Sequence, residues 1–272
     1  MAVHRVSEEP ASLLEQLREL AAAGDLFQML LAREIRVRYR QTALGVAWVI
    51  LQPLVPALIF AAVFGSFARL PSEGMPYFLF ALAGLVIFSL FSNAASRAGN
   101  AFLRDGQLVS KAYFPRALLP LAAGTGAVVD FAVGLSLVVV LSIATGHATP
   151  GMIIAVPIVA SVALALGLAF GLAVSALGAR YRDFVIAMPF VLQVALYASP
   201  IVYSSELVPA DLRVAYGLNP LVGLTETFRA SVLGAAPPLG SEIALGAAVS
   251  GLVVLIGIAV FNRAARDLSD VL

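Results

Sequence analysis

The chain has 272 residues, of which 61% are hydrophobic and 12% charged, and its formal net charge is +1. Average soluble domains are about 25% charged, so this composition excludes a soluble globular protein and predicts a membrane protein, while the near-neutral charge argues against a nucleic-acid binder. The absence of cysteine excludes disulfides, thiol catalysis and zinc–thiolate sites, and the two histidines, His4 and His147, are too far apart in sequence to form a metal site by themselves.

Residues 1–43 are expected to form cytoplasmic and interface helices. Within "SLLEQLREL", Ser12 and Glu15 have the spacing of a capping box, and the leucines fall on one helical face. Gly24 interrupts the pattern. An amphipathic helix is therefore predicted at the N-terminus.

A second helix is predicted from Asp25, which can cap it, toward Arg40. Its arginines and its apolar residues, Phe27 and Leu30 among them, occupy different faces, which is typical of a helix that lies in the membrane interface. A solvated cytosolic helix is the alternative, but a spanning segment follows directly and favours the interface. The basic patch consists of Arg33, Arg36, Arg38 and Arg40.

Six apolar runs are long enough to cross a hydrocarbon core of about 30 Å. They predict an all-α membrane domain over residues 44–262, followed by a cytoplasmic tail, 263–272. Most lysines and arginines fall on one side of these spans, with Arg69, Arg213 and Arg229 as the exceptions, so the positive-inside rule puts both termini in the cytoplasm. The predicted spans are residues 44–67, 76–96, 117–145, 152–178, 184–203 and 243–262.

The connection between the fifth and sixth spans is long and unusually apolar. Its segment 204–232 is too short and too charged to span, so a re-entrant helical segment is predicted, marked by Asn219 and Pro220 and carrying Glu226 and Arg229. An ordinary outer loop with a surface helix is the alternative. One helical face of the segment is apolar and consists of Leu221, Leu224, Phe228 and Val232.

Motifs for catalysis and cofactor binding are absent from the sequence. It contains no GxxxxGK[ST] phosphate loop, so no ATP site is expected in this chain, and it has neither a zinc motif nor a GxSxG elbow. Asp130 is the one acidic residue placed within a span. It could serve a proton relay, but no relay partner is evident, so a structural carboxylate is favoured.

Small and aromatic residues recur in the spans. Gly167 and Gly171 have GxxxG spacing, which predicts close helix packing. Most aromatic side chains in a span face lipid or the core, yet aromatic faces stack well on sugar rings. A conduit with aromatic residues and few ionisable groups suits a polysaccharide better than an ion. The candidate lining residues are Phe60, Phe64, Phe88, Phe91, Phe190, Tyr197 and Tyr203.

The segment "REIRVRYRQTALGVAWVILQPLVPALIFAAVFG" (33–65) resembles the first span of permease subunits of type-2 ABC exporters, in the branch that exports O-antigen, capsular polysaccharide and teichoic acid. The similarity continues in family order over nearly the whole chain. The further blocks are "LVSKAYFPRALLPLA" (108–122), "VVDFAVGL" (128–135), "ARYRDF" (179–184), "YASPIVY" (197–203) and "NPLVGLTETFR" (219–229).

This resemblance implies a transport subunit of the bacterial inner membrane without an enzymatic site of its own. Two copies would form a conduit for a lipid-linked glycan, and two separate ATPase subunits would bind ATP and Mg. The loop between the second and third spans would couple to the ATPase through Arg104, Tyr113, Phe114, Pro115 and Arg116.

The resemblance also bears on the remaining candidates. The segment 204–232 would cap the exit, and the basic patch could contact lipid headgroups or the pyrophosphate of the substrate. Arg97 departs from the small polar residues expected after the second span, and it is interpreted as an anchor at the membrane surface. Two other functions stay open, namely a permease of the same fold for a lipid or drug, and a proton-coupled carrier using Asp130.

Overall fold

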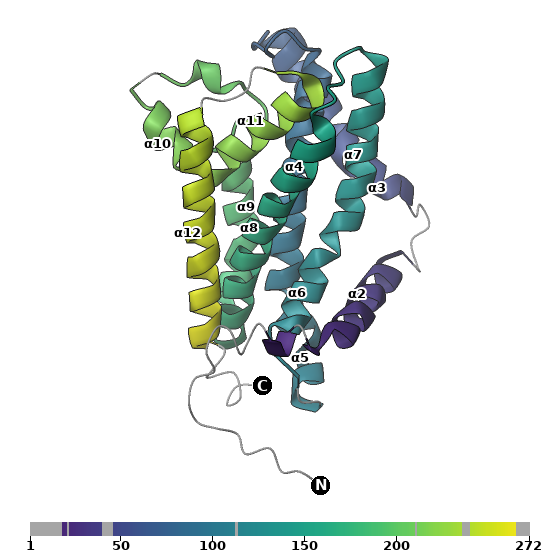
Figure 1. The fold of residues 1–272 in the computed structure, drawn as a ribbon, viewed down its shortest axis with the longest axis vertical. Helices are drawn as coiled ribbons and strands as arrows, with labels where there is room; N and C mark the ends of the chain where they lie inside the picture. The colour runs from purple at the N-terminus through teal and green to yellow at the C-terminus, as the bar shows by residue number, and fades with distance from the viewer. Residues whose placement is uncertain are drawn as a thin grey trace.

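The computed structural model describes residues 18–20, 22–39, 46–111, 114–209, 211–235 and 240–264, and the regular structure in these ranges is helical throughout (Figure 1). The predicted helix near Ser12, the residues Arg40 and Tyr113, and the tail 265–272 lie outside the described residues. The first long helix, α2, begins at Gly24 and ends at Tyr39. It starts one residue before Asp25, so this residue lies within the first turn and not at the cap position that the sequence predicted.

Five helices in the described residues are long and apolar enough to cross a membrane, so the chain is a multi-pass membrane protein. Their apolar ranges are Ala47–Phe67, Tyr77–Gly106, Leu118–Ala144, Met152–Arg180 and Ile243–Ala264, which correspond to the first four and the last predicted spans. The helices that form them are α3 (Val46–Phe60), the π-helical η1 (Ala61–Phe67), α4 (Tyr77–Gly99), α5 (Ala101–Lys111), α6 (Leu118–Thr125), α7 (Ala127–Ala144), α8 (Met152–Arg180) and α12 (Gly240–Ala264).

The fifth predicted span, 184–203, is shorter in the structure. Its helix, α9, runs from Asp183 to Tyr197 and has 15 residues, which at 1.5 Å per residue gives about 22 Å. The following turn is held by Asn219, whose amide nitrogen donates hydrogen bonds to the Ala198 carbonyl at 3.0 Å and to the Ser199 hydroxyl at 2.9 Å. The number of six spans and the orientation of the termini therefore stay predictions.

Helix α4 forms the centre of the bundle and packs mainly against α8, with α7 and α6 beside it. In its spanning window 78% of the residues are buried, compared with 11% in the first span. The close α4–α8 contact depends on two glycines, because a Cβ atom on Gly167 would lie 2.5 Å from the Phe91 carbonyl oxygen and one on Gly171 would lie 2.6 Å from that of Ala95. The predicted small-residue packing is confirmed.

The third predicted span, 117–145, is divided by a turn at Gly126 into α6 and α7. Asp130 lies in the first turn of α7 as a consequence. A Cβ atom on Gly126 would lie 3.1 Å from the Arg97 guanidinium, so the small residue leaves room for that side chain. The acidic residue is thus placed at a helix start, where the helix dipole favours negative charge.

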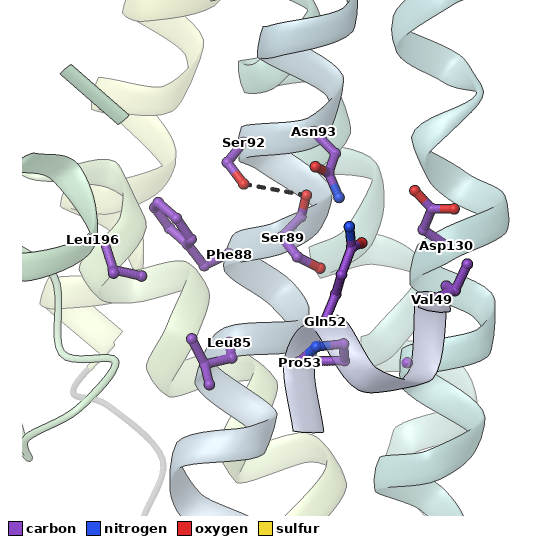
Figure 2. Close-up of a pocket in the computed structure, with 11 residues that line it drawn as sticks. Val49, Gln52, Pro53, Leu85, Phe88, Ser89, Ser92, Asn93, Asp130 and Leu196 are labelled. Carbon is purple, nitrogen blue, oxygen red and sulfur yellow. Dashed lines mark hydrogen bonds between the residues drawn. The ribbon is translucent and has the colours of Figure 1, made fainter. Parts of the chain in front are cut away.

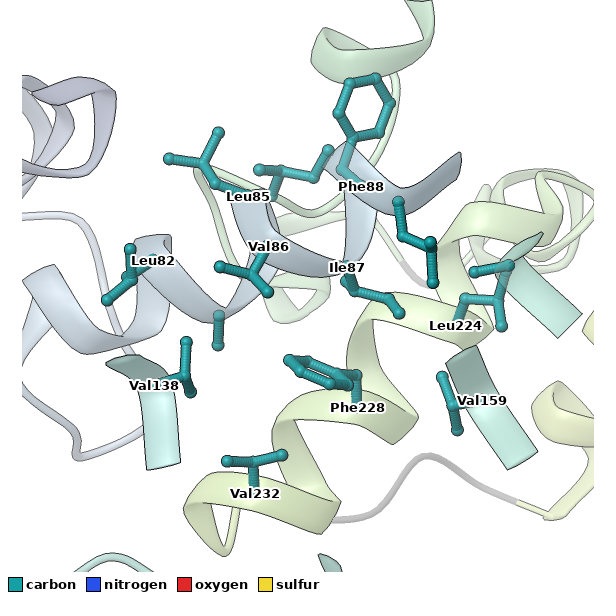
Figure 3. Close-up of a cluster of buried hydrophobic side chains, with 14 of the residues drawn as sticks. Leu82, Leu85, Val86, Ile87, Phe88, Val138, Val159, Leu224, Phe228 and Val232 are labelled. Atoms are coloured by element: carbon teal, nitrogen blue, oxygen red, sulfur yellow. The ribbon is translucent and has the colours of Figure 1, made fainter. Parts of the chain in front are cut away.

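The connection after α9 contains η2 (Ser205–Leu207), α10 (Arg213–Gly217) and α11 (Pro220–Leu233). Helix α11 lies across the end of the bundle opposite α2 and α5 and contacts α4, α8, α12 and α7 (Figure 1). The apolar face predicted for it is buried, and Phe228 packs among side chains of α4 and Val159 of α8 (Figure 3). Thr225 and Arg229 on the other face are buried too, which differs from an ordinary surface helix.

Candidate functional site

A pocket of about 250 Å³ lies between α3, α4, α7 and α9 (Figure 2). Its walls combine apolar side chains with amides and hydroxyls. Asp130 is the one ionisable residue among the described lining residues. The lining residues are Val49, Gln52, Pro53, Leu85, Phe88, Ser89, Ser92, Asn93, Asp130, Gly134 and Leu196.

Two amides give the pocket its polar character. The amide ends of Gln52 on α3 and Asn93 on α4 point toward one another (Figure 2), and neither has a hydrogen-bond partner within the described ranges. Ser89 donates to the Val86 carbonyl at 2.8 Å, so its oxygen keeps lone pairs for an acceptor role. Unsatisfied polar groups are costly in lipid. This side of α3 and α4 therefore faces water, substrate or protein.

Asp130 at the edge of the pocket is held by two arginines. Its carboxylate lies 2.8 Å from the guanidinium of Arg38 on α2, and it accepts a hydrogen bond from Arg97 on α4. The Asp130 side chain is 5% exposed and that of Arg97 10%. The two cations compensate the buried negative charge, as burial requires. Asp130 thus has partners that the sequence did not reveal, and Arg97 is an ion-pair partner rather than an anchor at the membrane surface.

A second group of charges joins α2 to α5. Arg33 lies 2.6 Å from Asp105, and Arg104 binds both carboxylate oxygens of Glu34 at 2.6 and 3.1 Å. Arg104 also contacts Asp105 at 2.8 Å. Both arginine side chains are about half exposed, so each single pair contributes only about 0–1 kcal/mol. Their joint effect is geometric, because four side chains fix one helix against the other.

The remaining members of the predicted basic patch and coupling loop are not gathered around one point. Arg36 is exposed and donates to the Ala32 carbonyl of its own helix at 3.2 Å. Phe114 packs against a buried cluster that contains Phe102 and Phe261, while Pro115 and Arg116 lie in the turn before α6. Their roles stay predictions.

The predicted conduit aromatics divide into three groups. Phe60 and Phe64 lie 5.9 Å apart between ring centroids, and Phe88 and Phe91 lie 6.0 Å apart. Phe88 lines the pocket. On α9 the rings of Phe190 and Tyr197 are 69% and 59% exposed, and the Tyr203 hydroxyl donates to the Tyr197 carbonyl at 3.2 Å. Of the seven predicted aromatics, Phe88 alone is a lining residue of this pocket.

Arg229 on α11 is fully buried, with 1% of its surface exposed. Its guanidinium lies 3.5 Å from the centroid of the Phe80 ring and donates to the carbonyls of Phe80 at 3.1 Å and Ile201 at 2.7 Å. Gly84 makes this possible, because a Cβ atom there would lie 2.6 Å from Nη2 of Arg229. Arg229 therefore ties α11 to α4 and to the turn after α9.

Further hydrogen bonds surround Arg229. Tyr77 donates to the Val202 carbonyl, Ser204 donates to Glu73 at 2.7 Å, and Tyr216 donates to the Tyr203 hydroxyl at 3.1 Å. Arg229 lies outside the spanning helices. Burial lowers the pKa of its guanidinium to about 10, so the side chain stays charged at neutral pH. Burial and the bond to Tyr203 raise the pKa of the Tyr216 phenol, which stays neutral.

The buried group around Arg229 was not predicted from the sequence. The signal available was an arginine on a helix whose other residues are largely apolar, three positions after Glu226. Asn219 and Pro220, by contrast, have the local roles that their types suggest. The side-chain Oδ1 of Asn219 accepts from the Leu221 backbone N–H at 3.0 Å and caps α11, and Pro220 occupies the first turn.

The structure is thus a multi-pass helical membrane domain with a polar pocket in its side and an ion-paired helix at one end. The chain belongs to the ABC-2 type transporter family, whose model matches residues 25–233. The resemblance derived from the sequence blocks is confirmed by this match.

Curated relatives cover nearly the full length of the chain. The O-antigen export system permease protein RfbA of Myxococcus xanthus is 24% identical over 260 residues, which is 95% of this chain and 99% of the relative. A protein of the same description from Klebsiella pneumoniae is 22% identical over 91% of this chain and 95% of its own. The polysialic acid transport protein KpsM of Escherichia coli is 23% identical over 86% and 92%.

Proposed function

We propose that this chain is the membrane-spanning subunit of an exporter that moves a lipid-linked polysaccharide across the bacterial inner membrane. The family match and the names of three full-length relatives support polysaccharide export. In the structure of this chain, the feature that supports the proposal is the pocket between α3, α4, α7 and α9. Its two amides, which have no partner among the described residues, and its serine hydroxyls beside Phe88 suit a neutral, hydroxyl-rich substrate and leave little for a simple ion to bind.

The transport cycle requires a source of energy, and the sequence has no phosphate loop. Two separate ATPase subunits, with ATP and Mg²⁺, supply it in this proposal. The contact surface is α5 and the turn through Phe114, Pro115 and Arg116, which lie at the same end of the bundle as α2 (Figure 1). This end faces the cytoplasm, as do both termini, in agreement with the basic patch on α2 and the positive-inside rule.

The complete conduit requires a second copy of the chain. Gln52 is an exposed amide on a spanning helix, and the aromatic residues Phe190 and Tyr197 of α9, the helix that contributes Leu196 to the same pocket, are exposed as well. A polar side chain on a lipid-facing surface is unfavourable, so a second copy covers this side and encloses the substrate path. At the opposite end, α11 and the segment before it close the exit as a re-entrant element.

Deletion of the gene in the source bacterium tests the proposed function. The expected result is loss of the surface polysaccharide, seen by carbohydrate staining of outer-membrane extracts, together with accumulation of lipid-linked glycan in the inner membrane. Restoration by the plasmid-borne chain is the control. If a lipid or a drug accumulates instead and the surface glycan is unchanged, the chain is a permease of the same fold with another substrate.

A further inference from the structure

The pocket holds two amides whose hydrogen-bonding capacity is unused in the described part of the protein. Each amide has a carbonyl acceptor and two N–H donors. Gln52 and Asn93 stand on neighbouring helices and face each other across the pocket (Figure 2). A pair of this kind can donate to one hydroxyl and accept from the next, which is the pattern that vicinal hydroxyls of a sugar ring present.

The rest of the lining supports the same ligand chemistry. Ser89 and Ser92 donate their hydroxyl protons to backbone carbonyls of α4, at 2.8 and 3.4 Å, so their oxygens are left as acceptors. Leu85, Phe88 and Leu196 form an apolar flank beside these groups. The C–H face of a pyranose fits such a flank while its hydroxyls reach the polar wall.

The charge of the pocket discriminates between neutral and acidic sugars. Asp130 faces the pocket, whereas its partners Arg38 and Arg97 are not among the lining residues. Both arginines are engaged by Asp130, so a carboxylated sugar would lose water from its charge without gaining an ion-pair partner in the lining. A neutral ring avoids this desolvation cost.

The size of the pocket limits how much glycan it holds. Ligand pockets for drug-sized molecules begin at about 300 Å³, and this one, at about 250 Å³, lies just below that range. One ring of a polymer fits, and the neighbouring rings lie outside it along the path between the helices.

We propose that this pocket is a subsite for one uncharged pyranose unit, recognised through the amides of Gln52 and Asn93. The inference rests on the proposed export function and adds to it the residues that contact the sugar and the charge class that they select. Both amides are contact residues, because each lies in the lining with its polar end in the pocket (Figure 2).

Trp48 gives a direct readout of binding. It is the one tryptophan of the chain, it is 53% exposed, and it lies one helical turn before Gln52 on α3. The full-length chain in lipid nanodiscs is titrated with methyl glucoside, and the Trp48 fluorescence is recorded. A saturable change is expected. Methyl glucuronide, which has the same ring with a carboxylate, is expected to bind about tenfold more weakly, because its carboxylate would lose water without gaining an ion-pair partner in the lining.

Amide variants identify the contact residues. Gln52→Leu and Asn93→Leu are each expected to weaken binding of methyl glucoside by about three- to tenfold, the range that the loss of one neutral hydrogen bond predicts. Asn262→Leu on α12 is the matched control, because that amide lies outside the pocket lining, and it should leave the affinity unchanged. The near-isosteric Gln52→Glu and Asn93→Asp give a second test if a leucine variant fails to fold. These acidic variants should weaken the binding of methyl glucuronide more than the binding of methyl glucoside.

Two results would overturn the subsite. One is the absence of a saturable signal with methyl glucoside, methyl mannoside and methyl galactoside. The other is equal affinity in the parent and in both amide variants. The deletion experiment separates these outcomes from the export function. If deletion of the gene abolishes export but the amide variants bind sugar as the parent does, the subsite is wrong and the export function stands. If the chain binds sugar but deletion of its gene leaves export intact, the export function is wrong and the sugar site stands.

Discussion

The guanidinium of Arg38 on α2 lies 2.8 Å from the carboxylate of Asp130 on α7. Because Arg33 and Glu34 on the same helix bind Asp105 and Arg104 of α5, α2 connects α5 with the edge of the pocket. A movement of α5 by a bound ATPase would reach Asp130 through one rigid helix.

Replacement of Asp130 by asparagine should destabilise the protein. Arg97 and Arg38 would then lie close together without the carboxylate, and breaking a buried ion pair costs about 3–5 kcal/mol. Thermal unfolding in detergent, followed by Trp48 fluorescence, should show a clear drop in midpoint. The additional change Arg97→Gln should recover part of the loss, since it removes one uncompensated charge. A fully stable Asp130→Asn protein that no longer transports would instead favour the proton-coupled carrier.

Exchange of the charges between α2 and α5 should affect coupling more than stability. Glu34→Arg and Arg104→Glu each place like charges together at an exposed pair, which costs only about 1 kcal/mol. In the reconstituted complex with the ATPase, each single variant should reduce transport per ATP hydrolysed. The double variant restores opposite charges and should recover most of the ratio. If the double variant transports no more substrate per ATP hydrolysed than either single variant, coupling does not pass through the contact between α2 and α5.

Arg229 and Gly84 should depend on each other. Arg229→Met removes the donors to two buried carbonyls and should cost about 2–4 kcal/mol of stability. Gly84→Ala should also destabilise the parent protein, because the new methyl group would lie 2.6 Å from the guanidinium. In the Arg229→Met background the methyl group meets no guanidinium, so its cost should be smaller. A double-mutant cycle of unfolding midpoints measures this coupling, and strictly additive effects would contradict it.

The α4–α8 contact should not tolerate larger side chains. Gly171→Val would place atoms within 2.6 Å of the Ala95 carbonyl and 2.5 Å of the Ala98 side chain, and overpacking of this kind costs about 1–3 kcal/mol. A lower unfolding midpoint and a lower yield of membrane-inserted protein are expected. Gly251→Ala on α12 is the control, because a Cβ atom there meets no atom within 4 Å. Comparable losses for both variants would exclude a specific packing effect.

Much of the bundle could be predicted because hydropathy is a local property. The apolar runs located five spans, and the spacing of Leu221, Leu224, Phe228 and Val232 located the buried face of α11. The end of α9 was harder to predict. The apolar run continues to Tyr203 with Ser199 and Pro200 inside it. The turn at these residues is held by an amide 20 residues away, on Asn219, that binds the Ser199 hydroxyl.

The polar contacts between helices could not be predicted from single residues. Arg97 and Asp130 are 33 positions apart, and their contact depends on α4 and α7 being neighbours, which hydropathy does not encode. Helical spacing puts Arg229 on a face of α11 other than the apolar one, and arginines are seldom fully buried. An aromatic ring and two backbone carbonyls from other segments offset that tendency, and all three belong to the tertiary structure.

The amide wall of the pocket has a consequence for throughput. A site made of two neutral amides and two hydroxyls binds a sugar weakly, and at an affinity of about 1 mM with an association rate of about 10⁶ M⁻¹s⁻¹ it empties on the order of a thousand times per second. Each ring would therefore leave long before a turnover of the ATPase ends. Weak binding by Gln52 and Asn93 lets a long polymer keep moving, because no single sugar ring stays bound long enough to hold the glycan in place.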